Sequence, residues 1–125
     1  MRYLLDVNAL IAVIWRNHPD HSKADVWLEG KDLATCPLSE LGFLRISTNP
    51  KALNADMAIS RRLLKAFLQK HTSQFLPDDL LALKCSAQKS EQVTDCYLAE
   101  LAASNGMKLA TLDAGIMHAA VQVIH

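Results

Sequence analysis

The stretch Arg2-Tyr3-Leu4-Leu5-Asp6 decides the fold, because a short apolar run here stops abruptly on an acid. Such a run is typical of a buried strand in a parallel sheet, and its carboxyl end delivers the acid to one edge of that sheet. The pattern returns near the other end of the chain, where Lys108-Leu109-Ala110-Thr111-Leu112 precedes Asp113. Ligands of open α/β sheets bind beyond the carboxyl ends of the strands. We therefore expect Asp6 and Asp113 to face one crevice.

Helical and strand patterns alternate between these two runs. Ser39 and Thr94 are expected to cap two of the helices, and residues 71–91 are ambiguous, with a short strand predicted at 75–77 and a brief helix at 78–83. The alternation predicts an α/β fold, a three-layer α/β/α sandwich with a short central parallel sheet. Apolar spacing predicts helices that include residues 9–14, 24–28, 40–46, 56–70 and 95–102, and strands over 33–36 and 121–124.

Composition limits the class of protein. The 125 residues are enough for one compact domain, expected to span 1–125, and a hydrophobic share of 50% is typical of a globular chain. Lys plus Arg equals Asp plus Glu at 13 each, so bulk charge neither favours nor excludes a nucleic-acid partner. No apolar run approaches the roughly 20 residues of a membrane-spanning helix. The acid at Asp6 interrupts any signal-peptide pattern, and three scattered cysteines indicate free thiols, so the cytoplasm is expected.

Two further acids, Glu40 and Asp95, fall in the first turns of predicted helices. A crossover helix begins where its strand finishes, so helix starts and strand ends lie at the same edge of a parallel sheet. We therefore expect Glu40 and Asp95 to join Asp6 and Asp113 at one rim, although the four acids are far apart in the chain.

Carboxylates that gather in this way need a cation. Ionised carboxylates at close range raise one another's pKa values, and a divalent ion relieves the repulsion. Oxygen ligands select hard metals, here Mg²⁺ or Mn²⁺, whereas zinc prefers histidine or cysteine. Such an ion acidifies a bound water, polarises a phosphoryl group and stabilises the leaving oxygen of a phosphodiester. The four acids are therefore candidate metal ligands and candidate catalytic residues.

Each acid also has a purely structural interpretation. Asp6 can be a strand-end cap, and Asp113 can begin a turn with Gly115. Glu40 and Asp95 can be ordinary first-turn acids that the helix dipole favours. An acid in a setting as apolar as that of Asp6 is seldom idle, because burial of an unpaired charge is costly. The joint pattern therefore favours a functional role for all four.

Other polar residues lie close to the acid-bearing positions in the sequence. Asn8 and Thr111 flank them, where they can hold the acids or a metal-bound water, or act only as caps. Arg45 is a candidate for contact with a phosphate of the substrate. His18 and His21 are three residues apart, but a proline between them and the lack of further ligands favour a surface or packing role over a metal site.

Four stretches of the chain together resemble a known family. Residues 1–12 resemble the opening of PIN-domain proteins, specifically the VapC-type toxins of bacterial toxin–antitoxin pairs. Residues 36–45, 93–102 and 110–116 also resemble the family, in its order and at its usual chain length. The resemblance covers nearly the whole chain, and its motifs are short individually but fairly specific together.

The resemblance implies roles for particular residues. Asp6, Glu40, Asp95 and Asp113 fall on the family's four acidic positions, and Asn8 and Thr111 fall on its accompanying polar positions. It implies a Mg²⁺-dependent endoribonuclease that acts on RNA, forms a homodimer, and is neutralised by a small cognate antitoxin whose C-terminal segment lies in or beside the acidic pocket. This chain departs from the pattern at Ala114, where relatives often carry a basic residue for substrate contact.

Three alternatives stay open. A phosphatase of the haloacid-dehalogenase type also opens with a strand that ends on an aspartate, but it needs a second aspartate where this chain has Asn8. A PIN-like module can bind RNA or a partner without cutting, although the presence of all four acids argues against this. A PIN-domain nuclease can also process RNA without any antitoxin.

Overall fold

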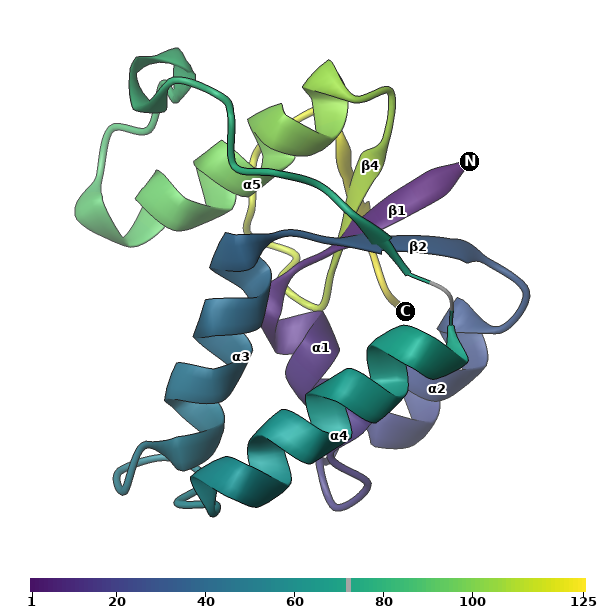
Figure 1. Cartoon of the computed structure of the whole chain (residues 1–125). Helices are drawn as coiled ribbons and strands as arrows, with labels where there is room; N and C mark the ends of the chain where they lie inside the picture. Colours follow the sequence, from purple (N-terminus) through teal and green to yellow (C-terminus); the bar gives the residue numbers. More distant parts are fainter. Residues whose placement is uncertain (72) are drawn as a thin grey trace.

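This computed structural model describes residues 1–71 and 73–125. A parallel sheet lies at its centre (Figure 1). The strands are β1 (Arg2–Leu5), β2 (Asp32–Thr35), β3 (Gln74–Phe75), β4 (Lys108–Thr111) and β5 (Val121–Val123), in the order β3-β2-β1-β4-β5. The helices are α1 (Val7–Ile14), α2 (His21–Leu28), α3 (Pro37–Thr48), α4 (Met57–Lys70) and α5 (Val93–Ser104), and the 3-10 turns are η1 (Ala82–Lys84) and η2 (Ser90–Gln92). Because β1 is the central strand, whatever follows it lies in the middle of the sheet's carboxyl edge.

Alternation along the strands sorts the side chains into two cores. Leu4 pairs in register with Ala34 and Leu109, and this row packs on α5. Leu5 pairs with Ala110, and their row packs on the helices of the opposite face. Figure 1 shows α5 on one side of the sheet and α1 to α4 on the other. The predicted three-layer α/β/α sandwich is confirmed.

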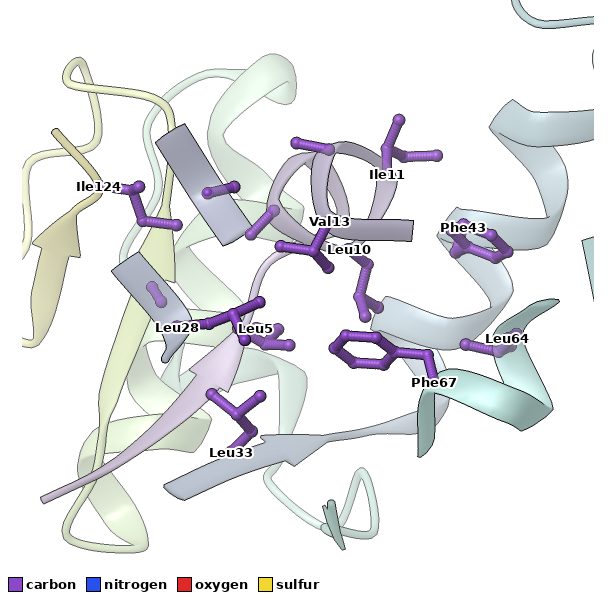
Figure 2. Packing of buried hydrophobic residues seen from close by; sticks show 14 residues of the cluster. Leu5, Leu10, Ile11, Val13, Leu28, Leu33, Phe43, Leu64, Phe67 and Ile124 are labelled. Carbon is purple, nitrogen blue, oxygen red and sulfur yellow. The ribbon is translucent and has the colours of Figure 1, made fainter. Parts of the chain in front are cut away.

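The larger core fixes α1 against the sheet. Figure 2 shows Leu10 of α1 close to Phe67 of α4, with Leu5 on one side of them and Phe43 of α3 on the other. Leu10 and Phe43 are fully buried, and each such side chain contributes roughly 1.5–3 kcal/mol relative to exposure. Since α1 begins directly after Asp6, this packing also fixes the position of that acid.

A glycine allows α3 to lie close to the first turn of α1. A Cβ added at Gly42 would lie 2.5 Å from Cγ2 and 3.2 Å from Cγ1 of Val7. Val7 is β-branched and stiff, so it cannot move aside freely. We expect Gly42→Ala to lower the free energy of unfolding by about 1–3 kcal/mol, as overpacking usually does, measured by urea denaturation.

The matched double variant identifies the cause of that loss. Val7→Ala removes the methyl groups that the new Cβ would meet, so Val7→Ala with Gly42→Ala is expected to be more stable than the sum of the two single losses predicts. Strictly additive losses would show that Gly42 is required for some reason other than its contact with Val7.

Two predicted caps are wrong. The helix α3 begins at Pro37 with Cys36 as its N-cap, because proline at the first helical position presets the backbone there; Ser39 is instead buried inside the first turn, with its Oγ 3.4 Å from the Cys36 sulfur. The helix α5 begins at Val93, because η2 leads directly into it and Gln92 is already helical in φ and ψ. Thr94 therefore lies in the first turn and does not precede it.

The ambiguous segment has little regular structure. The predicted strand at 75–77 is the short β3, which ends at Phe75, and the brief helix predicted at 78–83 is replaced by the 3-10 turn η1 over Ala82–Lys84. Residue 72 of this segment lies outside the described residues. Across those that are described, we find no helix with the length and apolarity needed to span a membrane.

Candidate active site

Asp6 joins the central strand to the first helix. It follows β1 directly and is the N-cap of α1, with a side chain that is only 3% exposed. Oδ1 accepts a hydrogen bond of 2.7 Å from the backbone N–H of Val7, and Oδ2 accepts one of 2.7 Å from the hydroxyl of Thr111. Burial raises the pKa of Asp6, the two hydrogen bonds oppose this shift, and the charge of Asp113 adds to it.

Thr111, at the end of β4, connects the polar groups around Asp6. While its hydroxyl donates to Asp6, its oxygen accepts from Nδ2 of Asn8 and from the backbone N–H of Asp113, each at 3.1 Å. Oδ1 of Asn8 accepts in turn from the backbone N–H of Leu112 at 3.0 Å. The network fastens the start of α1 to the end of β4, so both polar side chains hold the loops that carry the acids.

The other two aspartates are more accessible to solvent. Asp95 is half-buried in the first turn of α5, where burial is the largest cause that raises its pKa to about 6, with further contributions from the charges of Asp6 and Asp113. Asp113 is exposed beyond β4, and its Oδ1 accepts a hydrogen bond of 2.8 Å from the backbone N–H of Gly115. The charges of Asp6 and Asp113 both raise the pKa of Asp95, so the three carboxylates are near enough to interact electrostatically.

These three aspartates line a common cavity of about 470 Å³. It thus brings together acids that are up to 107 positions apart, as 113 − 6 = 107. His18 is another polar residue that lines the cavity, although the sequence favours a surface or packing role for it. The sequence pattern misses this position because it depends on how the α1–α2 loop folds back. The polar residues that line the cavity are Asp6, Asn8, His18, Arg45, Thr94, Asp95 and Asp113.

Glu40 lies near the same edge of the sheet but has a different surrounding. It is in the first turn of α3, as expected, and its Oε2 accepts a hydrogen bond of 2.8 Å from the hydroxyl of Thr35 at the end of β2. The strand β2 pairs with β1, so the carboxyl ends of the two strands are adjacent. Among the described residues that line the aspartate cavity, Glu40 is not included. A role for Glu40 in catalysis stays a prediction.

The raised pKa of Asp95 has a consequence for stability. Well below pH 3.8 the carboxyl of Asp95 is protonated in the folded and unfolded chains alike, so ionisation has no cost. The cost appears as the pH rises from 3.8 towards about 6 and is complete above that. Solvent screening reduces it to about 1 kcal/mol. In EDTA at about pH 7.5, Asp95→Asn is therefore expected to raise the Tm by a few degrees.

Thermal unfolding over a range of pH checks this expectation. The stabilisation by Asp95→Asn should shrink steadily between about pH 6 and pH 4. A stabilisation that does not change with pH would show that the cost of ionising Asp95 is not its cause.

Comparison with known proteins places the chain in a family. A family model described as the PIN domain matches residues 3–122. The chain belongs to the PIN-domain family. Ribonuclease VapC38 of Mycobacterium tuberculosis (strain ATCC 25618 / H37Rv) is 40% identical to this PIN-domain chain over 127 residues, which cover 95% of the chain and 90% of the relative. The resemblance to VapC-type PIN domains is confirmed.

Solved structures of other PIN-domain proteins share the fold. The crystal structure of VapBC2 from Rickettsia felis, bound to a DNA fragment from their promoter, matches with a TM-score of 0.66 at 13% identity and covers 98% of each chain. The structure of FitAcB from Neisseria gonorrhoeae matches with a TM-score of 0.65 at 24% identity, over 100% of this chain and 97% of that one. At these sequence identities the matches confirm the PIN-like fold, and they give no information about the site residues.

The donor chemistry of this PIN-domain site suits a hard cation. Carboxylates are the ligands of Mg²⁺ and Mn²⁺, and burial together with the charges of Asp6 and Asp113 raises the pKa of Asp95 to about 6, a shift that a bound cation would oppose. Among residues 1–71 and 73–125, however, no three or more His, Cys, Asp or Glu side chains form a group that can hold a metal ion as they stand. The fit is therefore to an ion bound by one or two carboxylates that keeps several of its waters, as Mg²⁺ usually does.

A second cavity adjoins the first at Asp95 and Asp113. It measures about 300 Å³ and is bounded otherwise by residues around η2 and by the loop that follows β4. His118 lines it, but its ring is fully occupied, because Nε2 donates to Glu100 at 2.9 Å and Nδ1 accepts from the backbone N–H of Ala120 at 2.9 Å. Two of the acids of the PIN-domain site thus form the boundary between two hollows.

Proposed function

We propose that this chain is a Mg²⁺- or Mn²⁺-dependent endoribonuclease and the toxin of a VapBC-type toxin–antitoxin pair. The observation that carries the proposal is the shared cavity of Asp6, Asp95 and Asp113, three carboxylates from separate segments beside the cationic side chain of Arg45. Negative groups that hold a metal, next to a positive group for a phosphate, are the components that phosphodiester hydrolysis requires. The name of VapC38, a ribonuclease, supports RNA as the substrate.

One or two of the carboxylates of Asp6, Asp95 and Asp113 would hold the metal directly, and the remaining carboxylate would reach it through its waters. When bound, the metal would supply a more acidic water and positive charge for the phosphoryl group. The chain's own residues prepare the site for it. The hydroxyl of Thr111 orients one oxygen of Asp6, and the backbone N–H of Gly115 orients one oxygen of Asp113. Arg45 would contact a backbone phosphate of the RNA.

Glu40 would be the fourth acid of this site. Its carboxylate is held by Thr35 on the neighbouring strand end. From that position we propose that it acts through water on the metal or the nucleophile, because it does not line the cavity among the described residues.

The names of the structural neighbours support a partner. VapBC2 is a complex of two kinds of chain by its name, and its crystals contain promoter DNA. We propose a small cognate antitoxin for this chain, a homodimeric state, action as one domain over 1–125, and a cytoplasmic location. Co-purification of the chain with a small protein encoded beside it would distinguish a toxin from an RNA-processing nuclease that has no antitoxin.

Cleavage of RNA by the purified chain tests the proposal. With Mg²⁺ or Mn²⁺, single-stranded RNA should be cut internally and the matching DNA should not. Binding of RNA without cleavage, under all metal conditions and with the antitoxin absent, would favour the non-catalytic PIN-like module. Incorporation of phosphate into Asp6 from a phosphoryl donor would favour the phosphatase of the haloacid-dehalogenase type.

A further inference from the structure

His18 lines the aspartate cavity from the loop between α1 and α2. The loop turns at this point, because the backbone N–H of His18 bonds to the carbonyl of Trp15 and that of His21 bonds to the carbonyl of His18, each at 3.0 Å. The ring is half-buried, so it is partly ordered by the protein and still reachable from the cavity. The nuclease chemistry described above makes no use of it.

Hydrogen bonding fixes which ring nitrogen carries the proton. Nδ1 of His18 accepts a hydrogen bond of 3.0 Å from the backbone N–H of Asp20. An accepting nitrogen has no proton of its own, so the neutral ring carries its proton on Nε2 and is a donor there. Among the hydrogen bonds of the described residues, none uses Nε2. The ring therefore offers one uncharged N–H donor to whatever enters the cavity.

His21 shows the opposite arrangement three residues later. Its Nδ1 lies 2.9 Å from the carbonyl oxygen of Ala12, which can only accept, so Nδ1 of His21 is the donor. That ring holds α2 to α1 and does not line the aspartate cavity among the described residues. The two histidines are similar in sequence position, yet only His18 presents its proton to the site.

We propose that His18 is a substrate-positioning residue, which donates from Nε2 to a non-bridging phosphate oxygen of the RNA in this cavity. This inference rests on the proposed ribonuclease function. The negative charge of a phosphate oxygen makes it the strongest acceptor that RNA offers to a neutral donor. Arg45 would attract the phosphates of the same RNA backbone by its charge. His18 would fix the orientation of one phosphate, because the hydrogen bond from the backbone N–H of Asp20 holds its ring in place.

Two substitutions separate the donor from the turn. In His18→Asn, the amide oxygen can take the place of Nδ1 and accept from the backbone N–H of Asp20, so the turn persists, but the new side chain is too short to reach the position of Nε2. In His18→Gln, the longer amide can put an N–H near the position of Nε2, while the acceptor for the turn is lost. His21→Asn is the matched control, since an amide N–H can still donate to the carbonyl of Ala12.

Cleavage kinetics and RNA binding give the test. For a short single-stranded RNA oligonucleotide of mixed sequence, His18→Asn is expected to raise KM about tenfold with kcat nearly unchanged, because a uniform binding contact is lost. His18→Gln should stay closer to wild type, and His21→Asn should match it. The reverse order of the two His18 variants, or no change in KM in folded His18→Asn, would overturn the proposal.

The salt dependence of binding distinguishes a neutral donor from a cation. In an Asp95→Asn background, where cleavage should be slow enough for binding to be measured, adding His18→Asn should weaken RNA binding without changing the slope of log Kd against log salt. Arg45→Gln should reduce that slope by about 0.7, as for one lost cation–phosphate contact on a single strand. A slope change with His18→Asn would show that the ring binds as a cation. RNA that binds with no effect of His18 refutes only this inference, whereas a wild-type chain that cuts no RNA refutes the proposed function.

Discussion

Asp95→Asn is expected to lower kcat/KM for RNA cleavage by about a thousandfold, while the protein stays folded. The amide keeps the size of the side chain but removes the negative charge that the metal requires. Because burial and the charges of Asp6 and Asp113 all disfavour ionised Asp95, the substitution should also stabilise the metal-free protein. The same variant should therefore be less active and more stable, a combination that simple damage to the fold does not produce.

Parallel variants complete this test. Asp6→Asn and Asp113→Asn should show losses of similar size, and Glu40→Gln a smaller one, because its carboxylate is bonded to Thr35 outside the aspartate cavity. Asp32→Asn is the matched control: Asp32 is exposed at the amino end of β2, on the opposite edge of the sheet. Wild-type activity in folded Asp95→Asn would contradict the proposed role of the aspartates.

Removal of divalent cations is expected to reduce RNA cleavage at least as much as Asp95→Asn does. In EDTA, cleavage should fall by about a thousandfold or more, and Mg²⁺ or Mn²⁺ should restore it. The ion also binds the folded state only, so Mn²⁺ at about 100 times its Kd should stabilise the wild type by about 2.7 kcal/mol. The same concentration should change the Tm of Asp95→Asn far less, which gives a readout independent of activity.

The two readouts separate different failures. A wild-type Tm that rises with Mn²⁺ but no cleavage of RNA would mean that the ion binds and the substrate is wrong. Full cleavage in EDTA would contradict metal dependence itself. Equal Tm shifts in the wild type and in Asp95→Asn would place the bound ion elsewhere on the protein.

The fold could be predicted because its signals are local. The run before Asp6 and the run before Asp113 each contain a complete strand with a buried carboxyl end, and the alternation of side chains along β1 sends Leu4 and Leu5 to opposite faces. Asp95 follows from the same rule, since a helix start shares an edge with the strand ends. The positions of these acids depend only on where each strand ends and each helix begins, and local sequence patterns indicate both.

Other features depend on contacts that local patterns do not contain. His18 reaches the cavity because of the turn after α1, and Glu40 is bonded to Thr35 because two adjacent elements meet there. The sequence pattern misplaces the start of α3, because Pro37 at the first helical position determines where the helix begins and Ser39 does not. A clue to His18 was present in the sequence, since a neutral histidine has one ring nitrogen that can accept a backbone hydrogen bond and another that can still donate.

Location of the bound ion tests the central assignment most directly. Crystals grown with Mn²⁺ and measured near the manganese absorption edge would show each ion as an anomalous peak. We predict a peak about 2 Å from a carboxylate oxygen of Asp6, Asp95 or Asp113, with water on its remaining sides. A peak only at other acids, such as Asp78 and Asp79, or no peak at a saturating concentration of Mn²⁺, would contradict a metal site built by these three aspartates.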